Sequence, residues 1–338
     1  MATEKPDTQE VLMDDDGEEP EIKRGMFEAW TAKAISNPKR AYKAMFYTAT
    51  IFFLVTTLFP FYWLFQVALT PRDNLQDVGL VPSGFDPSLL AQGDLTMGTN
   101  PGVFVEVFTI IPFHRYMINS FVIATVTTIV VIVVASLAGY VFGRLDFPGK
   151  SPMMLLVLIV SFFPPAAFFI PLNELFNTNI DILRPILTDG SLYNTPYAMV
   201  VPFSAIFMPL SIFILTTFYA QIPDGLEDAA RIEGTTRLGA LFRVIMPLSA
   251  PGVATAGVLT FIAVYNEYFF SSLMTNGEAA TWSPIVRGIL QLQNAGQFQV
   301  DYGMMAAGSI IAVLPVAILV VVAQEKIVSG LTSGALKE

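Results

Sequence analysis

Six long stretches of this chain contain no Asp, Glu, Lys or Arg. They run over residues 44–71, 116–143, 151–173, 190–223, 244–266 and 302–324. A helix that crosses the hydrocarbon core of a bilayer needs about 20 mostly apolar residues. Open strands are excluded in lipid, because their backbone N–H and C=O groups would stay unpaired. We therefore predict an all-α integral membrane protein with six transmembrane helices, at about 45–69, 115–142, 151–172, 196–219, 250–273 and 303–323.

The composition agrees with a membrane protein. Of the 338 residues, 54% are hydrophobic and only 14% are charged, whereas a soluble domain carries about 25% charged residues. The absence of cysteine excludes disulfides. The single histidine, His114, forms no catalytic or metal-binding group, and the basic residues do not cluster as they would on a nucleic-acid-binding face. We expect no enzyme activity, no metal site and no nucleic-acid partner.

Lysine and arginine predict the orientation in the membrane. With six spans both termini lie on one side, and 14 of the 18 basic residues fall on that side. Because cytoplasmic loops carry the excess of Lys and Arg, this distribution predicts cytoplasmic termini and a cytoplasmic loop at 221–249. The chain then divides into two parts. Residues 1–44 form a cytoplasmic acidic tail with an interfacial segment, and residues 45–338 form the transmembrane domain.

The third predicted span contains Pro164, Pro165 and Pro171. Proline interrupts helical hydrogen bonding, so this helix should bend. Irregular backbone at membrane depth is tolerated where it faces protein or a watery cavity. We expect this span to border a pathway, although prolines can also serve packing alone.

A polar segment, Pro223 to Pro247, separates the fourth and fifth spans and carries seven charged residues. Pro223 suits the start of a helix, and Asp224, Glu227 and Asp228 favour its first turns. Gly234 supplies the left-handed conformation that ends a helix, and Thr235 or Thr236 can cap a second one. The segment therefore predicts two short helices.

Within this segment the run L-E-D-A-A-R-I-E-G, followed by Pro247, resembles the EAA loop of ABC importer permeases. Asp228, Ala229 and Ala230 fill the EAA positions, and Glu233 stands where Asp is usual. The resemblance implies a coupling helix that fits a groove on a separate ATP-hydrolysing subunit. The residues implied in ATPase coupling are Leu226, Glu227, Asp228, Ala229, Ala230, Ile232, Glu233, Gly234 and Pro247.

Other motifs resemble the carbohydrate-uptake, maltose-type (MalG-like) permeases. Tyr265 to Phe269, Y-N-E-Y-F, is similar to the family's W-N-E-F segment, and Asn119 begins a further similar run. The C-terminal stretch from Gln324 to Lys337 is similar to the family's terminal tail. The resemblance implies the type I ABC importer permease (MetI-like) fold. It also implies pathway candidates Tyr265, Asn266, Glu267 and Asn119, and a C-terminal ATPase contact through Gln324, Gly330 and Gly334.

The family's function implies the transmembrane subunit of an ATP-driven importer for a disaccharide or oligosaccharide. Its implied partners are a second homologous (MalF-like) permease, an ABC ATPase dimer, an extracytoplasmic sugar-binding protein and the lipid bilayer. ATP and Mg would bind the partner ATPase, and no cofactor would bind this chain. The alternatives are a permease for glycerol phosphate or another polyol, a secondary transporter or channel, and a structural membrane anchor.

Overall fold

The computed structural model describes residues 38–178, 191–293 and 300–335, and these residues contain helices and no strand. They form two compact units, of which the first ends at Pro60 and the second begins at Phe61. The described part of the first unit is the larger part of one apolar helix, α2, which begins at Pro38. The predicted acidic tail lies almost entirely outside the described residues and stays a prediction.

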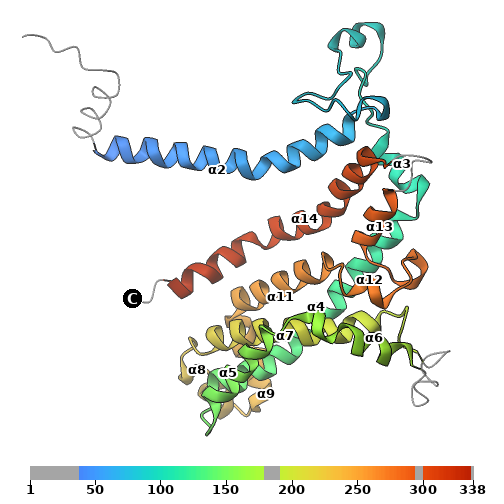
Figure 1. The fold of residues 1–338 in the computed structure, drawn as a ribbon. Coiled ribbons are helices and arrows are strands. Elements are labelled where there is room, and N and C mark those ends of the chain that lie inside the picture. Colours follow the sequence, from blue (N-terminus) through green and yellow to red (C-terminus); the bar gives the residue numbers. More distant parts are fainter. Residues whose placement is uncertain (1–37, 179–190, 294–299, 336–338) are drawn as a thin grey trace, which may run out of the picture. The chain divides into compact units, whose positions relative to one another are not determined.

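The second unit contains the end of α2 and all the elements that follow it (Figure 1). In order, the elements of the described chain are α2 (Pro38–Leu69), η1 (Arg72–Asn74), η2 (Pro87–Gln92), α3 (Val103–Ile110), α4 (Phe113–Arg144), α5 (Lys150–Ser161), η3 (Pro165–Phe168), α6 (Phe169–Asn177), α7 (Tyr197–Tyr219), α8 (Asp224–Ile232), α9 (Arg237–Ala240), η5 (Leu241–Ile245), α10 (Met246–Leu248), α11 (Ala250–Tyr265), α12 (Ser271–Met274), η6 (Ala279–Thr281), α13 (Ile285–Leu292) and α14 (Tyr302–Ala335).

Four described helices are long and apolar enough to cross a membrane: Tyr42–Leu69, Phe113–Arg144, Tyr197–Tyr219 and Tyr302–Glu325. The number rises to six if each of two bent helix pairs is counted as one span. The first bent pair covers the predicted span 151–172: α5 and the helical segment Pro165–Asn177 meet at 82°. The break falls beside Pro164, where helical hydrogen bonding has to stop.

The second bent pair joins Arg237–Leu248 to α11 at 84°. The helix of the predicted fifth span, 250–273, ends at Tyr265, because the chain turns at Asn266 before the short α12. Apolar side chains resume at Phe269 and Phe270 after Asn266 and Glu267, so hydropathy alone extends this span beyond its helical part.

Among the described helices of the second unit, α4 and α7 make the most extensive contact. A Cβ added at Gly139 would lie 3.0 Å from the Leu215 Cβ, and one at Gly143 would lie 3.0 Å from the Thr216 carbonyl oxygen. These two glycines, one turn apart, let the two backbones approach closely, as small residues do between membrane helices. Nearby, Tyr140, Tyr219, Leu241 and Ile245 share one buried cluster.

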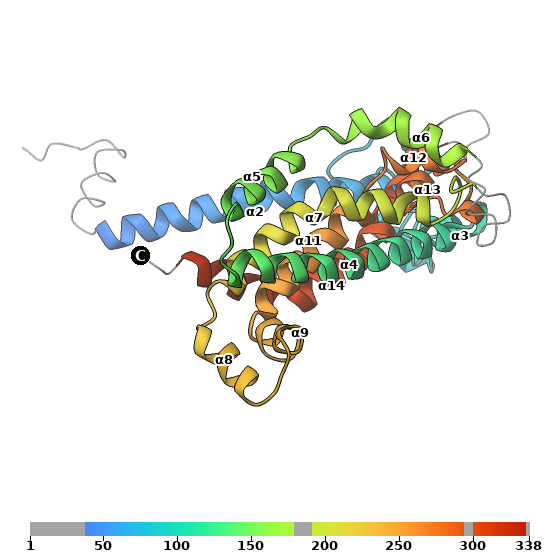
Figure 2. The same ribbon diagram turned by 90° about the horizontal axis from the view of Figure 1, so that it is seen from below.

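The remaining short elements gather at the two ends of α4. Figures 1 and 2 show α3, α12 and α13 near its N-terminal end, and α8 and α9 beside each other near its C-terminal end. A second buried cluster lies at the N-terminal end and includes Phe113, Tyr116, Tyr265 and Met304. The polar segment is therefore separated from the α12–α13 region by the length of α4.

Candidate functional site

The polar segment folds into the two predicted short helices. Helix α8 follows Pro223 and has Asp224 and Glu227 in its first turn, where negative charge is favourable. Gly234 has φ +92°, the left-handed conformation expected of it. The Thr236 hydroxyl accepts from the Gly239 backbone N–H at 3.1 Å and caps α9. The predicted capping pattern is confirmed, with Thr236 rather than Thr235 as the cap.

The second short helix is not regular throughout. After α9 the chain forms η5, a wide π-type turn over Leu241–Ile245, and then α10. Pro247 cannot donate a helical hydrogen bond, and its ring would collide with the carbonyl four residues earlier in an ideal α-helix. The wider turn next to Pro247 relieves that conflict.

Helix α8 has one buried acidic residue, and most of its other side chains are exposed. Glu227 is buried, whereas Asp228, Ala229 and Glu233 are exposed and Ala230 is partly buried. Two apolar side chains also face outward: Leu226 is 45% exposed and Ile232 is 88% exposed. Glu227 therefore faces the protein, while the other predicted coupling residues of α8 lie at or near the surface.

The apolar surface extends beyond the residues that the motif indicates. Leu238 of α9, Phe242 of η5 and Leu248 of α10 are exposed, as is Pro247. Pro247 belongs to the motif, whereas Leu238 and Phe242 do not. Each of these two is a large apolar residue next to an arginine, and that pattern was their sequence signal. We call Leu226, Ile232, Leu238 and Phe242 the apolar face of the polar segment.

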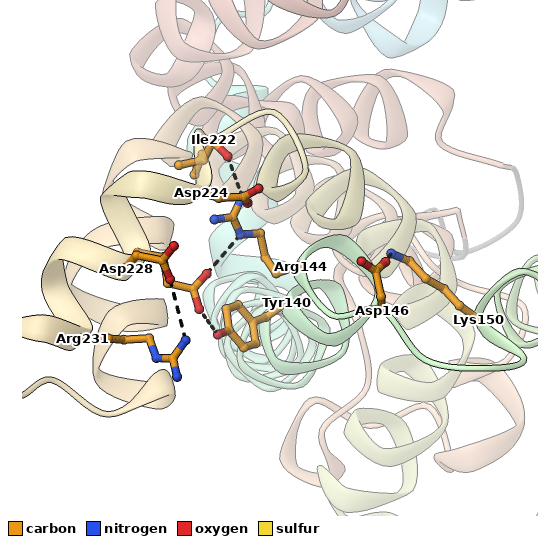
Figure 3. Close-up of polar contacts among 9 residues, drawn as sticks. Tyr140, Arg144, Asp146, Lys150, Ile222, Asp224, Asp228 and Arg231 are labelled. Atoms are coloured by element: carbon orange, nitrogen blue, oxygen red, sulfur yellow. Dashed lines mark hydrogen bonds and ion pairs between the residues drawn. The ribbon is translucent and has the colours of Figure 1, made fainter.

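A polar cluster fixes α8 to the C-terminal end of α4 (Figure 3). The Arg144 Nε donates to the Glu227 Oε2 at 3.1 Å, and its Nη1 lies 2.9 Å from the Asp224 Oδ1. Nη1 also donates to the Ile222 carbonyl oxygen, and the Tyr140 hydroxyl donates to the Glu227 Oε1. Tyr140, Arg144, Asp224 and Glu227 are called the Arg144 cluster below.

Two of the predicted pathway residues are buried. The Tyr265 hydroxyl donates to the Ala312 carbonyl oxygen at 3.1 Å, and its ring stacks on Phe261. The Asn119 amide donates to the carbonyl oxygens of Ala279 and Ser283 at 2.8 and 3.1 Å. Both side chains therefore join helices or loops that are distant in the sequence.

The other two pathway candidates lie just after α11. Glu267 holds the start of α12, since its carboxylate accepts from the backbone N–H groups of Phe270 and Ser271 at 2.7 and 3.0 Å. It also accepts from the Ser271 hydroxyl at 2.6 Å. Asn266, by contrast, has an exposed side chain. The described residues contain no group of three or more His, Cys, Asp or Glu that could hold a metal.

Comparison with known proteins decides the family. Residues 135–332, more than half of the chain, match the family model described as "Binding-protein-dependent transport system inner membrane component". The chain belongs to this family. The matched range contains the polar segment, α7, α11 and almost all of α14.

Relatives of this permease span most of its length. It is 32% identical over 295 residues to the sulfoquinovosyl glycerol transport system permease protein SmoH of Agrobacterium fabrum, covering 87% of this chain and 94% of that one. It is 33% identical over 280 residues to the trehalose transport system permease protein SugB of Mycobacterium tuberculosis, covering 83% and 92%.

The fold of the permease also matches a solved structure. A bacterial ABC transporter involved in the import of the acidic polysaccharide alginate contains a chain that matches it with a TM-score of 0.60 and 15% identity, covering 86% of this chain and 97% of that one. This likeness supports the all-helical importer fold. Membership of the family makes the chain a permease subunit of an ABC importer in the cell membrane, with ATP hydrolysis on a separate subunit. It argues against the secondary transporter or channel alternative.

The predicted C-terminal contact lies at the end of α14. Gln324 is exposed, and Gly330 and Gly334 fall within the last helical turns. Side chains from residue 326 onward lie outside the described part of the chain. The role of these residues in the permease stays a prediction.

Proposed function

We propose that this permease imports a disaccharide or oligosaccharide, and that α8 couples it to separate ATPase subunits. The substrate class is supported by relatives of nearly full length, whose names specify trehalose and sulfoquinovosyl glycerol. A third relative, at 30% identity, is the trehalose/maltose transport system permease protein MalG of Thermococcus litoralis. An extracytoplasmic binding protein would deliver the sugar.

The apolar face of the polar segment is the observation that carries the coupling role. It includes Leu226 and Ile232, and it lies within a segment of seven charged residues that would not enter lipid. Exposed apolar side chains rimmed by charge are typical of protein interaction sites. The neighbouring Ala229 leaves room for a close approach, so a groove on a partner subunit would fit this helix.

The charge distribution supports the side on which this contact forms. The excess of Lys and Arg favours cytoplasmic termini and a cytoplasmic polar segment. The cytoplasm is the compartment that holds ATP. We infer that ATP and Mg bind the paired ATPases. A second homologous permease would supply the other half of the pathway, and Gln324, Gly330 and Gly334 would form a second contact with the ATPases.

For the substrate route, Asn266 is the candidate with the strongest support. Its side chain is exposed, whereas Tyr265, Glu267 and Asn119 already bond to other parts of the chain. We therefore infer that Asn266 contacts the sugar and that the other three shape the route around it.

Point substitutions on the apolar face test the coupling role. Ile232→Asp and Leu226→Asp should each raise the Kd for the ATPase by about thirtyfold, which corresponds to losing about 2 kcal/mol of binding free energy at a central interface residue. Less ATPase should then co-purify with the permease. Leu95→Asp is the matched control, because Leu95 is equally apolar and 81% exposed in the segment between α2 and α3. Normal ATPase binding by Ile232→Asp and by a deletion of residues 226–234 would refute the docking role.

The substrate class needs its own experiment. The assembled importer in proteoliposomes, with its binding protein, should take up radiolabelled trehalose or maltose only when ATP is present. Glycerol 3-phosphate serves as the competing probe. Uptake of glycerol 3-phosphate alone would show that the substrate is a phosphorylated polyol and not a sugar. Uptake without ATP would contradict an ATP-driven importer.

A further inference from the structure

The Arg144 cluster links α8 to a helix that is distant in the sequence. Arg144 bonds to two carboxylates on the polar segment and to the Ile222 carbonyl oxygen just before it, and Tyr140 bonds to Glu227. Both oxygens of Glu227 are therefore paired. By contrast, the Asp228–Arg231 ion pair lies on the exposed side of α8 at 3.7 Å and takes no part in the cluster.

The Arg144–Glu227 pair of the cluster is nearly closed to solvent, whereas the Asp224 side chain is 89% exposed. The side chain of Arg144 is 4% exposed and that of Glu227 is 10% exposed. Separating such a pair would leave a buried charge without a partner, which is far costlier than separating a surface ion pair. The contact between α8 and α4 should therefore persist while the polar segment moves.

The end of α4 to which α8 is fixed has little freedom against α7. Gly139 and Gly143 bring the α4 backbone against Leu215 and Thr216, so any sliding would meet a steric barrier. Leu241 and Ile245 of η5 pack into the same buried cluster as Tyr140. The second short helix thus rests on the same support as α8.

We propose that Arg144 is a positioning residue that joins α8 and the C-terminal turns of α4 into one rigid unit. A displacement received at α8 is then delivered to the α4–α7 pair directly, and not only through the chain segments on either side of α8. This inference rests on the proposed docking role of α8. It assigns the step after docking, in which motion of the ATPase becomes motion of membrane-spanning helices.

Spin labels test the rigid unit without knowledge of the substrate. The chain has no cysteine, so Val141→Cys in α4 and Gly225→Cys in α8 provide two labelling sites at exposed positions outside the cluster. In the complete importer, the distance between the two labels should be the same without nucleotide and after trapping with ATP and vanadate. A distance that changes on trapping would overturn the proposal.

Substitutions identify the part that Arg144 plays. Arg144→Gln should broaden the distance distribution, and it should reduce the stimulation of ATP hydrolysis by the binding protein by roughly two- to thirtyfold. Arg144→Lys should recover part of both effects. Lys150→Gln is the control, because it removes a nearby cation that pairs with the exposed Asp146 at 3.5 Å. A narrow distribution and full stimulation in Arg144→Gln would overturn the proposal.

The outcome separates this inference from the docking role. If the ATPase fails to bind the wild-type polar segment, the proposed function fails. If the complex assembles but the labels move apart, only the rigid unit fails. Should Arg144→Gln not insert stably, Tyr140→Phe removes one hydrogen bond while keeping the ring, and it should broaden the distance distribution to a smaller extent. An unchanged distribution in that variant would count against the cluster.

Discussion

The Nε of Arg72 donates to the Oδ2 of Asp301 across 2.7 Å and joins the segment after α2 to the start of α14. The same guanidinium donates to the Glu106 Oε1 of α3 at 2.7 Å. Asp301 also accepts from the Met304 backbone N–H at 2.9 Å. The Glu106 hydrogen bond, with a smaller contribution from Asp301, raises the pKa of Arg72 above its ordinary value. One buried carboxylate thus caps a long helix and pairs with a permanent cation.

Replacing that carboxylate should destabilise the permease. Asp301→Ala removes the helix cap and one ion-pair partner, so the free energy of unfolding should fall by about 1–3 kcal/mol. Asp73→Ala, at an exposed acidic residue of the same region, should change it by less than about 0.5 kcal/mol. Denaturation of the purified permease in detergent measures both, and equal losses would contradict the capping role.

Added volume between α4 and α7 should also be destabilising. Gly139→Leu places side-chain atoms where Leu215 and the Thr216 backbone lie within about 3 Å of a Cβ, and overpacking of this kind costs about 1–3 kcal/mol. Gly225→Ala is the control, since nothing lies within 4 Å of its added Cβ, and alanine is a better helix former. Thermal unfolding in detergent should separate the two variants. Comparable melting temperatures would show that the helices are not tightly packed at Gly139.

The turn after α8 requires a left-handed residue. Gly234→Ala meets no steric neighbour, but at φ +92° an alanine is strained by about 1–2 kcal/mol. Asparagine tolerates this region better, so Gly234→Asn should be milder. In limited proteolysis of the polar segment, the Gly234→Ala variant should be cleaved fastest, Gly234→Asn more slowly and the wild type slowest. Equal cleavage of the alanine variant and the wild type would argue against the strain.

Glu267 should matter for the segment after α11. Glu267→Ala removes three hydrogen bonds at the start of α12, and the loss of such a cap costs about 0.5–2 kcal/mol. We expect faster hydrogen exchange at the backbone N–H groups of Phe270 and Ser271. Asn266→Ala, next to it and exposed, should leave this exchange unchanged. Protection that survives in Glu267→Ala would exclude the capping role.

Local rules were sufficient for the polar segment. Pro223, the early acids and Gly234 act within a few residues of themselves, so the start and end of α8 could be read from the sequence. The same holds for the break beside Pro164. The turn at Asn266 could not, because apolar residues continue beyond it and hydropathy does not distinguish a helix from the loop that follows.

Arg144 shows why the rest of the site was missed. The sequence identified it only as a basic residue that marks a side of the membrane, because its partners at Asp224 and Glu227 are some 80 positions away. One local signal was available. Tyr140 and Arg144 are four residues apart and so share a helix face. This spacing places two polar side chains side by side at the end of an apolar span. Its partners could be found only from the folded chain.

The wide turn η5 has a consequence for the register of the polar segment. A π-type turn accommodates one residue more than an α-helical turn, so the winding between α9 and α10 holds a surplus residue. If that residue were wound as regular α-helix, everything upstream would be rotated by about 100° about the helix axis, and the wide turn absorbs the residue without this rotation. The direction in which Leu238 is presented to a partner is thus preserved by the widening of that turn.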